Sequence, residues 1–223
     1  MSTIQQNLRN VHQQISNLEL NFGKSVTLIA VSKTHDIDKI KQAIAAGQQI
    51  FGENYLQEAL PKIAQLPKDI EWHFIGPIQS NKTKEIAENF SWVQTLDRLK
   101  IAKRLNEQRP QTLPPLNVLI QVNISHEATK SGIMPEELDQ FAKEISLLPQ
   151  LKLRGLMAIP APSDDPEQQR KVFKQMSLLF QTLQQSYDID TLSMGMTNDY
   201  LLAIEEGSTM VRVGTAIFGK RGN

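Results

Sequence analysis

Eight short apolar runs, each with the β-branched residues typical of strands, recur along the 223-residue chain with helical patterns between them. Strands that alternate with helices usually pair in parallel and connect by right-handed crossovers. Eight such units close a (β/α)8 barrel, also called a TIM barrel, whose usual length is about 250 residues. The sequence therefore predicts a single α/β domain of this kind over residues 1–223. The predicted strands are 26–32, 50–54, 72–76, 92–96, 116–123, 151–159, 191–196 and 211–218.

Helical patterns precede the first predicted strand and fill the gaps between the others. Apolar residues spaced by three and four from Ile4 to Leu18 predict an extra amphipathic helix at the N-terminus. Asp36 is a plausible N-cap after the first strand, and Asp165 with Pro166 marks another helix start. An open doubly wound sheet is the alternative architecture, but it normally carries a glycine-rich phosphate loop after its first strand. The segment SKTHD at that position has no glycine, so the barrel is favoured.

The composition argues against several classes of function. The 24 lysines and arginines balance 24 aspartates and glutamates, so nothing favours binding to nucleic acid or to an anionic membrane surface. The chain has no cysteine, which excludes disulfides, cysteine-based metal sites and thiol catalysis and fits a cytoplasmic location. Its polar N-terminus lacks a signal or transit pattern, and no apolar run approaches membrane-spanning length. The four histidines lack zinc-ligand spacing, so no metal site is expected.

Lys33 ends the first predicted strand, directly after the apolar run TLIAVS. In a (β/α)8 barrel the functional groups gather at the carboxyl ends of the strands. Desolvation there would disfavour the ammonium form of Lys33, and a neutral amine can attack a carbonyl to form a Schiff base. The alternative is a structural lysine whose amine reaches solvent from a strand end. The position of Lys33 alone leaves both hypotheses open.

The last two predicted strands suggest a site for an anion. Arg212 lies two residues before Gly214 on a strand, so both residues face the same side. A glycine lets backbone N–H groups approach an anion closely, and the hydroxyl of Thr215 adds a donor. Ser193 and Thr197, in the segment LSMGMTND, supply more hydroxyls at the end of the preceding strand. These groups either cradle one phosphate or serve only tight packing, and the residues alone do not decide.

Other polar motifs give weaker signals. GTAIFGK matches the start of a phosphate-binding P-loop, but Arg221 replaces the required Ser or Thr, so a nucleotide site is rejected. The chain has no G-x-S-x-G elbow, and a hydrolase triad therefore has no support. Glu53 is expected to form an ion pair or to be a surface carboxylate more than to act as an acid or base. A solvated helix face is favoured over an anion site for Lys82 and Lys84, and the role of Lys130 stays open.

An ordered set of short motifs runs from Ala30 to Gly219: AVSKTH, FGENYLQE, WHFIGPIQSNK, NVLIQVNIS, KSG, RGLMAIP, LSMGMTND and GSTMVRVGTAIFG. With this set, the chain resembles the pyridoxal phosphate homeostasis proteins, a family that binds pyridoxal 5′-phosphate (PLP) on the barrel of the alanine racemase N-terminal type. The resemblance covers almost the whole chain. The complete ordered set is far more specific than any one of its motifs.

The resemblance implies a role for each predicted site residue. Lys33 matches the lysine that forms an internal aldimine with PLP, and Asn54 matches an asparagine close to the ring. Arg212 matches the arginine that faces the pyridine nitrogen, where its permanent charge would discourage protonation and make PLP a weaker electron sink. Thr197 stands where the family more often has serine, which keeps the hydroxyl. The residues that match the phosphate-binding strand ends are Ser193, Thr197, Gly214 and Thr215.

The resemblance also implies a function in intracellular PLP homeostasis, with reversible PLP binding and delivery to apo-enzymes as expected activities. Alanine racemases carry a second domain that donates a catalytic tyrosine, whereas this sequence stops at Asn223, soon after the last predicted strand. We therefore expect a monomer without catalytic residues and without efficient turnover. Two alternatives stay open: a PLP-dependent amino-acid racemase or related enzyme, and a Schiff-base aldolase that uses no cofactor.

Overall fold

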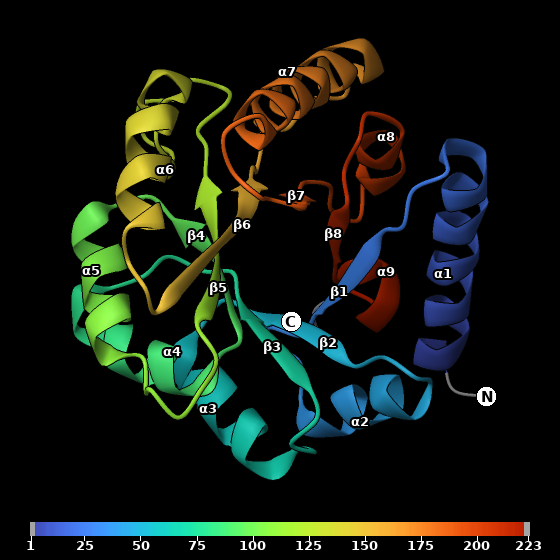
Figure 1. Cartoon of the computed structure of the whole chain (residues 1–223). Coiled ribbons are helices and arrows are strands. Elements are labelled where there is room, and N and C mark those ends of the chain that lie inside the picture. Colours follow the sequence, from blue (N-terminus) through green and yellow to red (C-terminus); the bar gives the residue numbers. More distant parts are fainter. Residues whose placement is uncertain (1–2, 221–223) are drawn as a thin grey trace.

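The apolar runs form eight parallel strands that close into one barrel, which confirms the predicted (β/α)8 architecture. The computed structural model describes residues 3–220. Each strand pairs with the next one along the chain, and β8 pairs with β1 to close the ring (Figure 1). The strands are β1 (Thr27–Val31), β2 (Ile50–Glu53), β3 (Glu71–Phe74), β4 (Trp92–Leu96), β5 (Leu116–Gln121), β6 (Leu151–Met157), β7 (Thr191–Ser193) and β8 (Met210–Val213).

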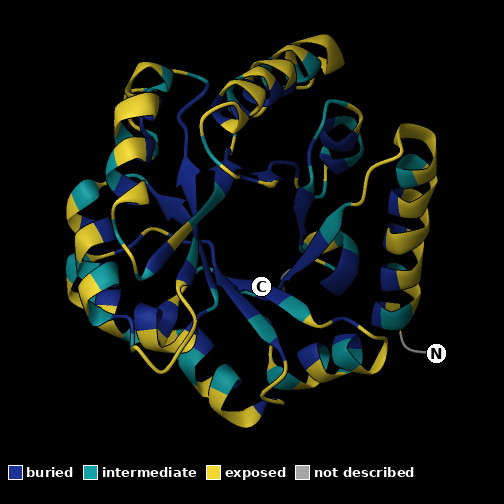
Figure 2. Ribbon diagram, viewed as in Figure 1, coloured by how far each residue is buried: buried dark blue, intermediate teal, exposed yellow. Residues whose placement is uncertain are grey.

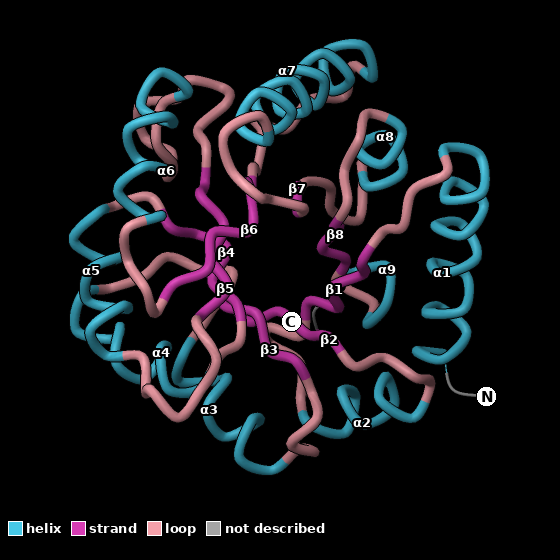
Figure 3. Tube along the Cα trace, viewed as in Figure 1, coloured by secondary structure: helices cyan, strands magenta, loops and turns pink. Residues whose placement is uncertain are grey.

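Helices follow the strands and cover the outside of the barrel (Figure 3). Both predicted N-caps are confirmed: the Asp36 carboxylate accepts a hydrogen bond from the Lys39 N–H, and the Asp165 carboxylate accepts one from the Glu167 N–H. Within residues 3–220, no helix has the length and apolar character needed to cross a membrane. The helices are α1 (Thr3–Phe22), α2 (Ile37–Ala45), α3 (Leu56–Gln65), α4 (Thr83–Asn89), α5 (Leu99–Gln108), α6 (Leu138–Ser146), α7 (Pro166–Gln184), α8 (Tyr200–Glu205) and α9 (Thr215–Phe218), with 3-10 turns at Ser80–Lys82 and Pro135–Glu137.

The eighth strand is shorter than the sequence predicts. β8 ends before Gly214, and Thr215–Phe218 forms a helix, so the predicted strand over 211–218 is wrong in its second half. The apolar letters TAIF fit either structure by periodicity, because so short a run cannot separate the two. The Gly214 carbonyl accepts hydrogen bonds from the N–H groups of Ile217 and Phe218 at 3.0 and 2.9 Å, which starts the helix. The other strand predictions differ from the structure only at their ends.

The predicted N-terminal helix, α1, packs beside the place where the barrel closes. It lies against α2, α8 and α9, with its buried residues on the inner side (Figures 1 and 2). Because α8 has six residues and α9 only four, α1 covers apolar surface that they leave open. Asn7 Nδ2 donates to the Ile217 carbonyl at 2.9 Å, and the Tyr200 hydroxyl donates to Gln14 Oε1. The buried face of α1 consists of Ile4, Leu8, Val11 and Ile15.

The inside of the barrel holds both apolar and polar side chains. Successive strand residues point to opposite sides. Leu28 and Ala30 of β1 therefore join the core under the helices, whereas Ile29 belongs to a separate inward cluster. His73 on β3 is fully buried and stacks on Trp92, with ring centres 4.9 Å apart. The inward apolar cluster consists of Ile29, Trp92, Leu119, Met157 and Met210.

The hydrogen bonds of His73 define its protonation. Its Nδ1 lies 2.9 Å from the amide nitrogen of Gln94, which can only donate, so Nδ1 is an acceptor. The proton therefore sits on Nε2, which donates to Glu71 Oε1 at 2.7 Å. Burial lowers the pKa of His73, although Glu71 opposes this shift. Arg154 on β6, whose guanidinium lies 4.5 Å from the Trp92 ring centre, also lowers the pKa of His73.

The contribution of α1 to stability is tested by truncating one of its leucines. We expect Leu8→Ala to lower the free energy of unfolding by about 2–5 kcal/mol, because the change leaves a cavity at a fully packed site. Leu20→Ala is the matched control on the same helix: Leu20 is 84% exposed whereas Leu8 is 2% exposed. Its effect should stay within about 0.5 kcal/mol. Urea unfolding measures both, and equal effects would contradict the packing of α1 described above.

The buried neutral His73 predicts a pH dependence of stability. Since the pKa of His73 is lowered in the folded state, the unfolded chain binds more protons as the pH falls below about 6.5. Stability should therefore decrease there, with this residue contributing up to about 1.4 kcal/mol per pH unit. His73→Gln should remove this contribution in urea unfolding measured from about pH 7.5 to 5.5. His12→Gln, at an exposed site on α1, should keep the wild-type slope. A wild-type slope in His73→Gln would refute the assignment.

Candidate functional site

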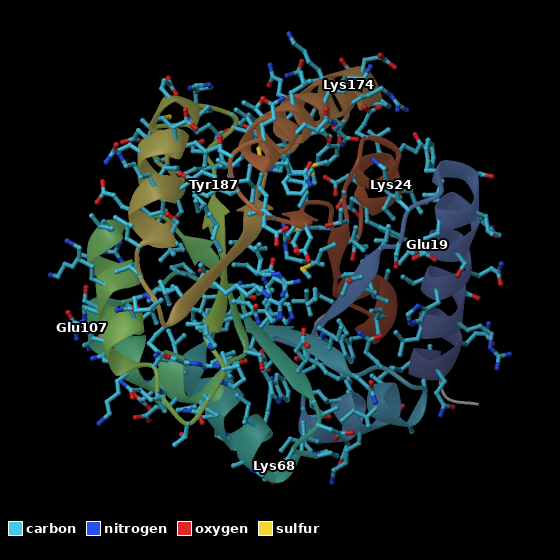
Figure 4. All side chains as sticks on the ribbon, viewed as in Figure 1. Glu19, Lys24, Lys68, Glu107, Lys174 and Tyr187 are labelled. Atoms are coloured by element: carbon cyan, nitrogen blue, oxygen red, sulfur yellow. The ribbon has the colours of Figure 1, made fainter. Side chains whose placement is uncertain are left out.

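A cavity of about 690 Å³ lies at the carboxyl ends of the strands, where active sites form in this fold. Its volume is within the range of small-molecule sites, about 300–1,000 Å³. Side chains crowd the centre of the strand ring, whereas the labelled Lys68, Glu107 and Lys174 lie at the outer rim (Figure 4). The cavity brings together six of the seven predicted site residues, namely Lys33, Asn54, Thr197, Arg212, Gly214 and Thr215.

Lys33 lies two residues beyond the last residue of β1 and is half-buried in the cavity wall. The backbone before it is fixed, because the Ser32 N–H donates to the Gly52 carbonyl at 3.0 Å. The Ser32 carbonyl accepts two hydrogen bonds, from the His35 N–H at 3.1 Å and from Lys62 Nζ at 3.0 Å. The Lys33 side chain therefore starts from a rigid strand end, which is the support that a precisely placed amine requires.

Glu53 and Lys62 form a buried ion pair behind this strand end. Lys62 Nζ donates to Glu53 Oε1 at 2.5 Å, and both side chains are buried. Burial raises the pKa of the Glu53 carboxyl, while the Lys62 ammonium acts in the opposite direction. Glu53 does not line the cavity. The prediction that Glu53 serves an ion pair is confirmed, and the pair fixes the Ser32 carbonyl next to Lys33.

Arg212 is a buried cation at the floor of the cavity. Its side chain is only 3% exposed. Nη1 donates to Ser193 Oγ at 2.5 Å, and Nη2 donates to the Ala158 carbonyl at 2.9 Å. Burial lowers the pKa of Arg212 to about 10, and the Asp199 carboxylate partly offsets this effect. The guanidinium therefore stays charged at neutral pH, and two fixed acceptors hold it.

Ser193 is the predicted site residue that does not line the cavity. It is fully buried on β7, where its Oγ accepts from Arg212 and donates to Gln94 Oε1 at 2.6 Å. In the structure, Ser193 therefore acts as a buried hydrogen-bond acceptor for Arg212. A direct contact between Ser193 and a bound phosphate stays a prediction.

The start of α9 forms a donor-rich corner of the cavity. Gly214 and Thr215 line this corner, and Thr197 joins it from the loop after β7. The first N–H groups of a helix have no partner within the helix, so N–H groups at this corner can donate to an anion. Thr197 Oγ1 lies 3.4 Å from the Ala216 nitrogen. A side chain at Gly214 would bring its Cβ to 3.3 Å from the Val31 carbonyl oxygen, a tight contact that glycine avoids.

Asn54 carries a buried acceptor that lacks a partner among the described residues. Its side chain lines the cavity just after β2, and Oδ1 makes no hydrogen bond within residues 3–220. An unpaired buried acceptor costs about 1–3 kcal/mol. Such a group is expected at a site that a polar ligand completes.

Several cavity residues escape prediction from the sequence. His35, which stacks on Phe218 with ring centres 4.9 Å apart, lines the wall near Lys33. Asp199 lines the opposite side, where its Oδ1 also accepts from the Met196 N–H at 2.7 Å. The loop 159–164 supplies more of the wall. The segment TND before α8 carries a helix-start signal that could have drawn attention to Asp199. The loop 159–164 carries no comparable signal.

The other three lysines singled out from the sequence do not line this cavity. Lys84 is an exposed residue whose Nζ lies 4.0 Å from a Glu88 carboxylate oxygen, which fits the favoured solvated face. Lys130 pairs with Glu127 at 3.4 Å. Neither residue lines the cavity, and Lys82 does not line it either.

Comparison with known proteins identifies the family. Residues 2–222 match the family described as "Alanine racemase, N-terminal domain". The "Pyridoxal phosphate homeostasis protein" of Pasteurella multocida (strain Pm70) is 58% identical over 227 residues, which cover 99% of this chain and 96% of that protein. PipY from Synechococcus elongatus PCC7942, in its structure with PLP bound, is 34% identical with a TM-score of 0.86 and covers 97% of this chain and 100% of its own.

A more distant structure shares only the fold. Alanine racemase from Corynebacterium glutamicum is 19% identical with a TM-score of 0.73, over 99% of this chain and 61% of that one. The predicted barrel type, with its additional N-terminal helix, is confirmed by this match and by the family match. The chain therefore belongs to the pyridoxal phosphate homeostasis proteins, a family built on the alanine racemase N-terminal domain.

Proposed function

We propose that this chain binds PLP in the cavity, holds it reversibly through the amine of Lys33, and thereby helps to control the free PLP of the cell. The observation that carries the proposal is the meeting of three groups in one cavity: a lysine amine, a buried guanidinium and a donor-rich helix start. PLP has three matching parts, namely an aldehyde, a pyridine nitrogen and a phosphate. Membership of the PLP homeostasis family supports the same assignment.

The residues present fit PLP part by part. The phosphate suits the corner formed by Thr197, Gly214 and Thr215, where hydroxyls and N–H groups can donate to an anion. The unpaired Oδ1 of Asn54 shows that the protein alone does not satisfy the polar groups of the cavity wall. The cavity volume of about 690 Å³ is ample for a ligand of this size.

The chain's own residues determine how PLP behaves when bound. PLP supplies an aldehyde that amines attack and a ring that withdraws electrons from a neighbouring carbon. Lys33 would supply the amine that holds the aldehyde. Arg212, which stays charged at neutral pH, would be the residue that faces the pyridine nitrogen and discourages its protonation. Such a site would suit storage of PLP more than chemistry on amino acids.

Release to apo-enzymes completes the proposal. Ile159 and Met196 line the cavity and are 37% and 43% exposed, so the cavity wall reaches the surface. Bound PLP can therefore leave without unfolding of the barrel. We propose a monomeric cytoplasmic carrier, whose partners are apo-enzymes that require PLP and neither nucleic acid nor membrane. This chain's balanced charge supports the last point.

The covalent role of Lys33 is tested by the spectrum of the protein mixed with PLP. The wild-type protein should show a near-visible absorption band that Lys33→Ala abolishes, since alanine has no amine to bond the aldehyde. Lys84→Ala, on the exposed face of α4, is the matched control and should keep the band. Borohydride trapping followed by mass analysis should place a pyridoxyl group on Lys33. An unchanged band in Lys33→Ala would refute the assignment, and an adduct with the mass of a sugar or keto acid would support an aldolase.

A PLP-dependent racemase is the second candidate, because the chain matches the N-terminal domain of alanine racemase. Under the binding proposal, amino acids should exchange their Cα hydrogen in deuterium oxide far more slowly than an ordinary turnover of about 10 per second. Mass spectrometry of several amino acids incubated with the PLP-loaded protein measures this exchange. Lys33→Ala reports the background rate. Exchange near ordinary enzyme rates would overturn the purely binding function.

A further inference from the structure

A continuous chain of hydrogen-bonded side chains runs down the inside of the barrel from the cavity. Arg212 Nη1 donates to Ser193 Oγ at 2.5 Å, and Ser193 Oγ donates to Gln94 Oε1 at 2.6 Å. Gln94 Nε2 donates to His73 Nδ1 at 2.9 Å. His73 Nε2 then donates to Glu71 Oε1 at 2.7 Å. Four strands contribute to this chain, which connects the cavity to the first residue of β3 at the opposite end of the barrel.

Every link in this chain has a fixed direction. Arg212 can only donate, so the Ser193 oxygen accepts and its own hydrogen must go elsewhere. Gln94 Oε1 receives that hydrogen, which leaves the amide nitrogen of Gln94 facing His73. The imidazole then accepts at Nδ1 and donates from Nε2 to the Glu71 carboxylate. No member can turn around without breaking the bonds on both of its sides.

Gln94 is the central residue of this hydrogen-bonded chain, and burying its polar amide costs free energy unless the amide is hydrogen-bonded. Its side chain is fully buried on β4, in a region that barrels of this type usually fill with branched aliphatic residues. A buried amide is tolerated only when it is hydrogen-bonded. Gln94 meets this condition by joining Ser193 above it to His73 below it. The printed hydrogen bonds of the amide go to His73, Met210 and Ser193, which do not line the cavity, and Ser193 links the amide to Arg212 in the cavity wall.

We propose that Gln94 is a positioning residue for Arg212: by taking the hydrogen of Ser193, it fixes the serine oxygen as an acceptor and so orients the guanidinium in the cavity. The effect of Gln94 on PLP rests on the proposed function, whereas its effect on Arg212 does not. Without Gln94, the Ser193 hydroxyl loses its acceptor, so the direction of its hydrogen and of its lone pairs is no longer fixed. Arg212 then keeps only the Ala158 carbonyl as a fixed acceptor.

The test replaces Gln94 by an apolar residue of similar length. In the PLP-free protein, Gln94→Met should make the guanidinium of Arg212 mobile, which nitrogen-15 NMR of the arginine side chains detects as faster rotation and exchange. In titrations with PLP, Gln94→Met should bind about tenfold more weakly, the value expected for losing one buried hydrogen bond. Gln121→Met, at another buried glutamine on the neighbouring strand β5, is the matched control and should keep the wild-type signals and affinity.

Rescue by a carboxylate separates positioning from packing. In Gln94→Glu, the carboxylate can accept from Ser193 and also from His73, provided that His73 takes up a proton at Nδ1. The Arg212 signals and the PLP affinity should then return close to wild type, and NMR of the imidazole should show a protonated His73 at neutral pH. The charged groups that face His73 in this variant are Glu71 on its own strand, Arg154 on β6 and the new carboxylate on β4.

The outcomes decide the proposal clearly. Unchanged Arg212 signals in a folded Gln94→Met variant would overturn it, and so would an equal loss in Gln121→Met. Should the wild-type protein fail to bind PLP, the proposed function falls, yet the NMR comparison on the PLP-free protein still decides whether Gln94 orients Arg212.

Discussion

The pairing of β1 with β8 is the interaction on which the site depends. Hydrogen bonds in register from Thr27↔Met210 to Ala30↔Val213 join the first strand to the last. This closure brings Lys33, just beyond β1, into the same cavity as Arg212 and the start of α9, although nearly the whole chain lies between them in sequence. The barrel thus turns two distant segments into one cavity wall, and α1 packs against α8 and α9 outside the same junction.

Lys62 and Arg212, two buried cations near this cavity, are held by different kinds of acceptor. The Lys62 ammonium neutralises Glu53 and holds the Ser32 carbonyl, so that a buried ion pair fixes the strand end beneath Lys33. Arg212 lies within 4.0 Å of no carboxylate in the described part of the chain and instead relies on neutral acceptors. Because its acceptors are neutral, the positive charge of Arg212 remains available to a ligand in the cavity. Lys62 and Arg212 therefore have different roles: Lys62 fixes the strand end, and Arg212 forms part of the cavity wall.

Much of this arrangement could be predicted from the sequence, and the limits have physical causes. The alternation of apolar runs with helical patterns predicted the barrel, and Lys33 stood out because a charge ended an apolar strand. The helix Thr215–Phe218 was missed because four apolar residues do not show a period. The chain through Gln94 could not be predicted, since its bonds join residues 21 and 99 positions apart. Only the closure of the barrel brings those residues within hydrogen-bonding distance.

The position of α1 has a consequence for synthesis on the ribosome. This helix is made first, yet its partners α8 and α9 are the last helices of the described chain. Until those helices emerge, its apolar face can pack only on α2, and the first strand has no eighth strand to join. Contacts between the two ends of a chain form late and slow folding, because a long loop must close before they are made. The nascent barrel therefore exposes the apolar face of α1 and an open sheet edge for most of translation, a state in which chaperones commonly engage a growing polypeptide.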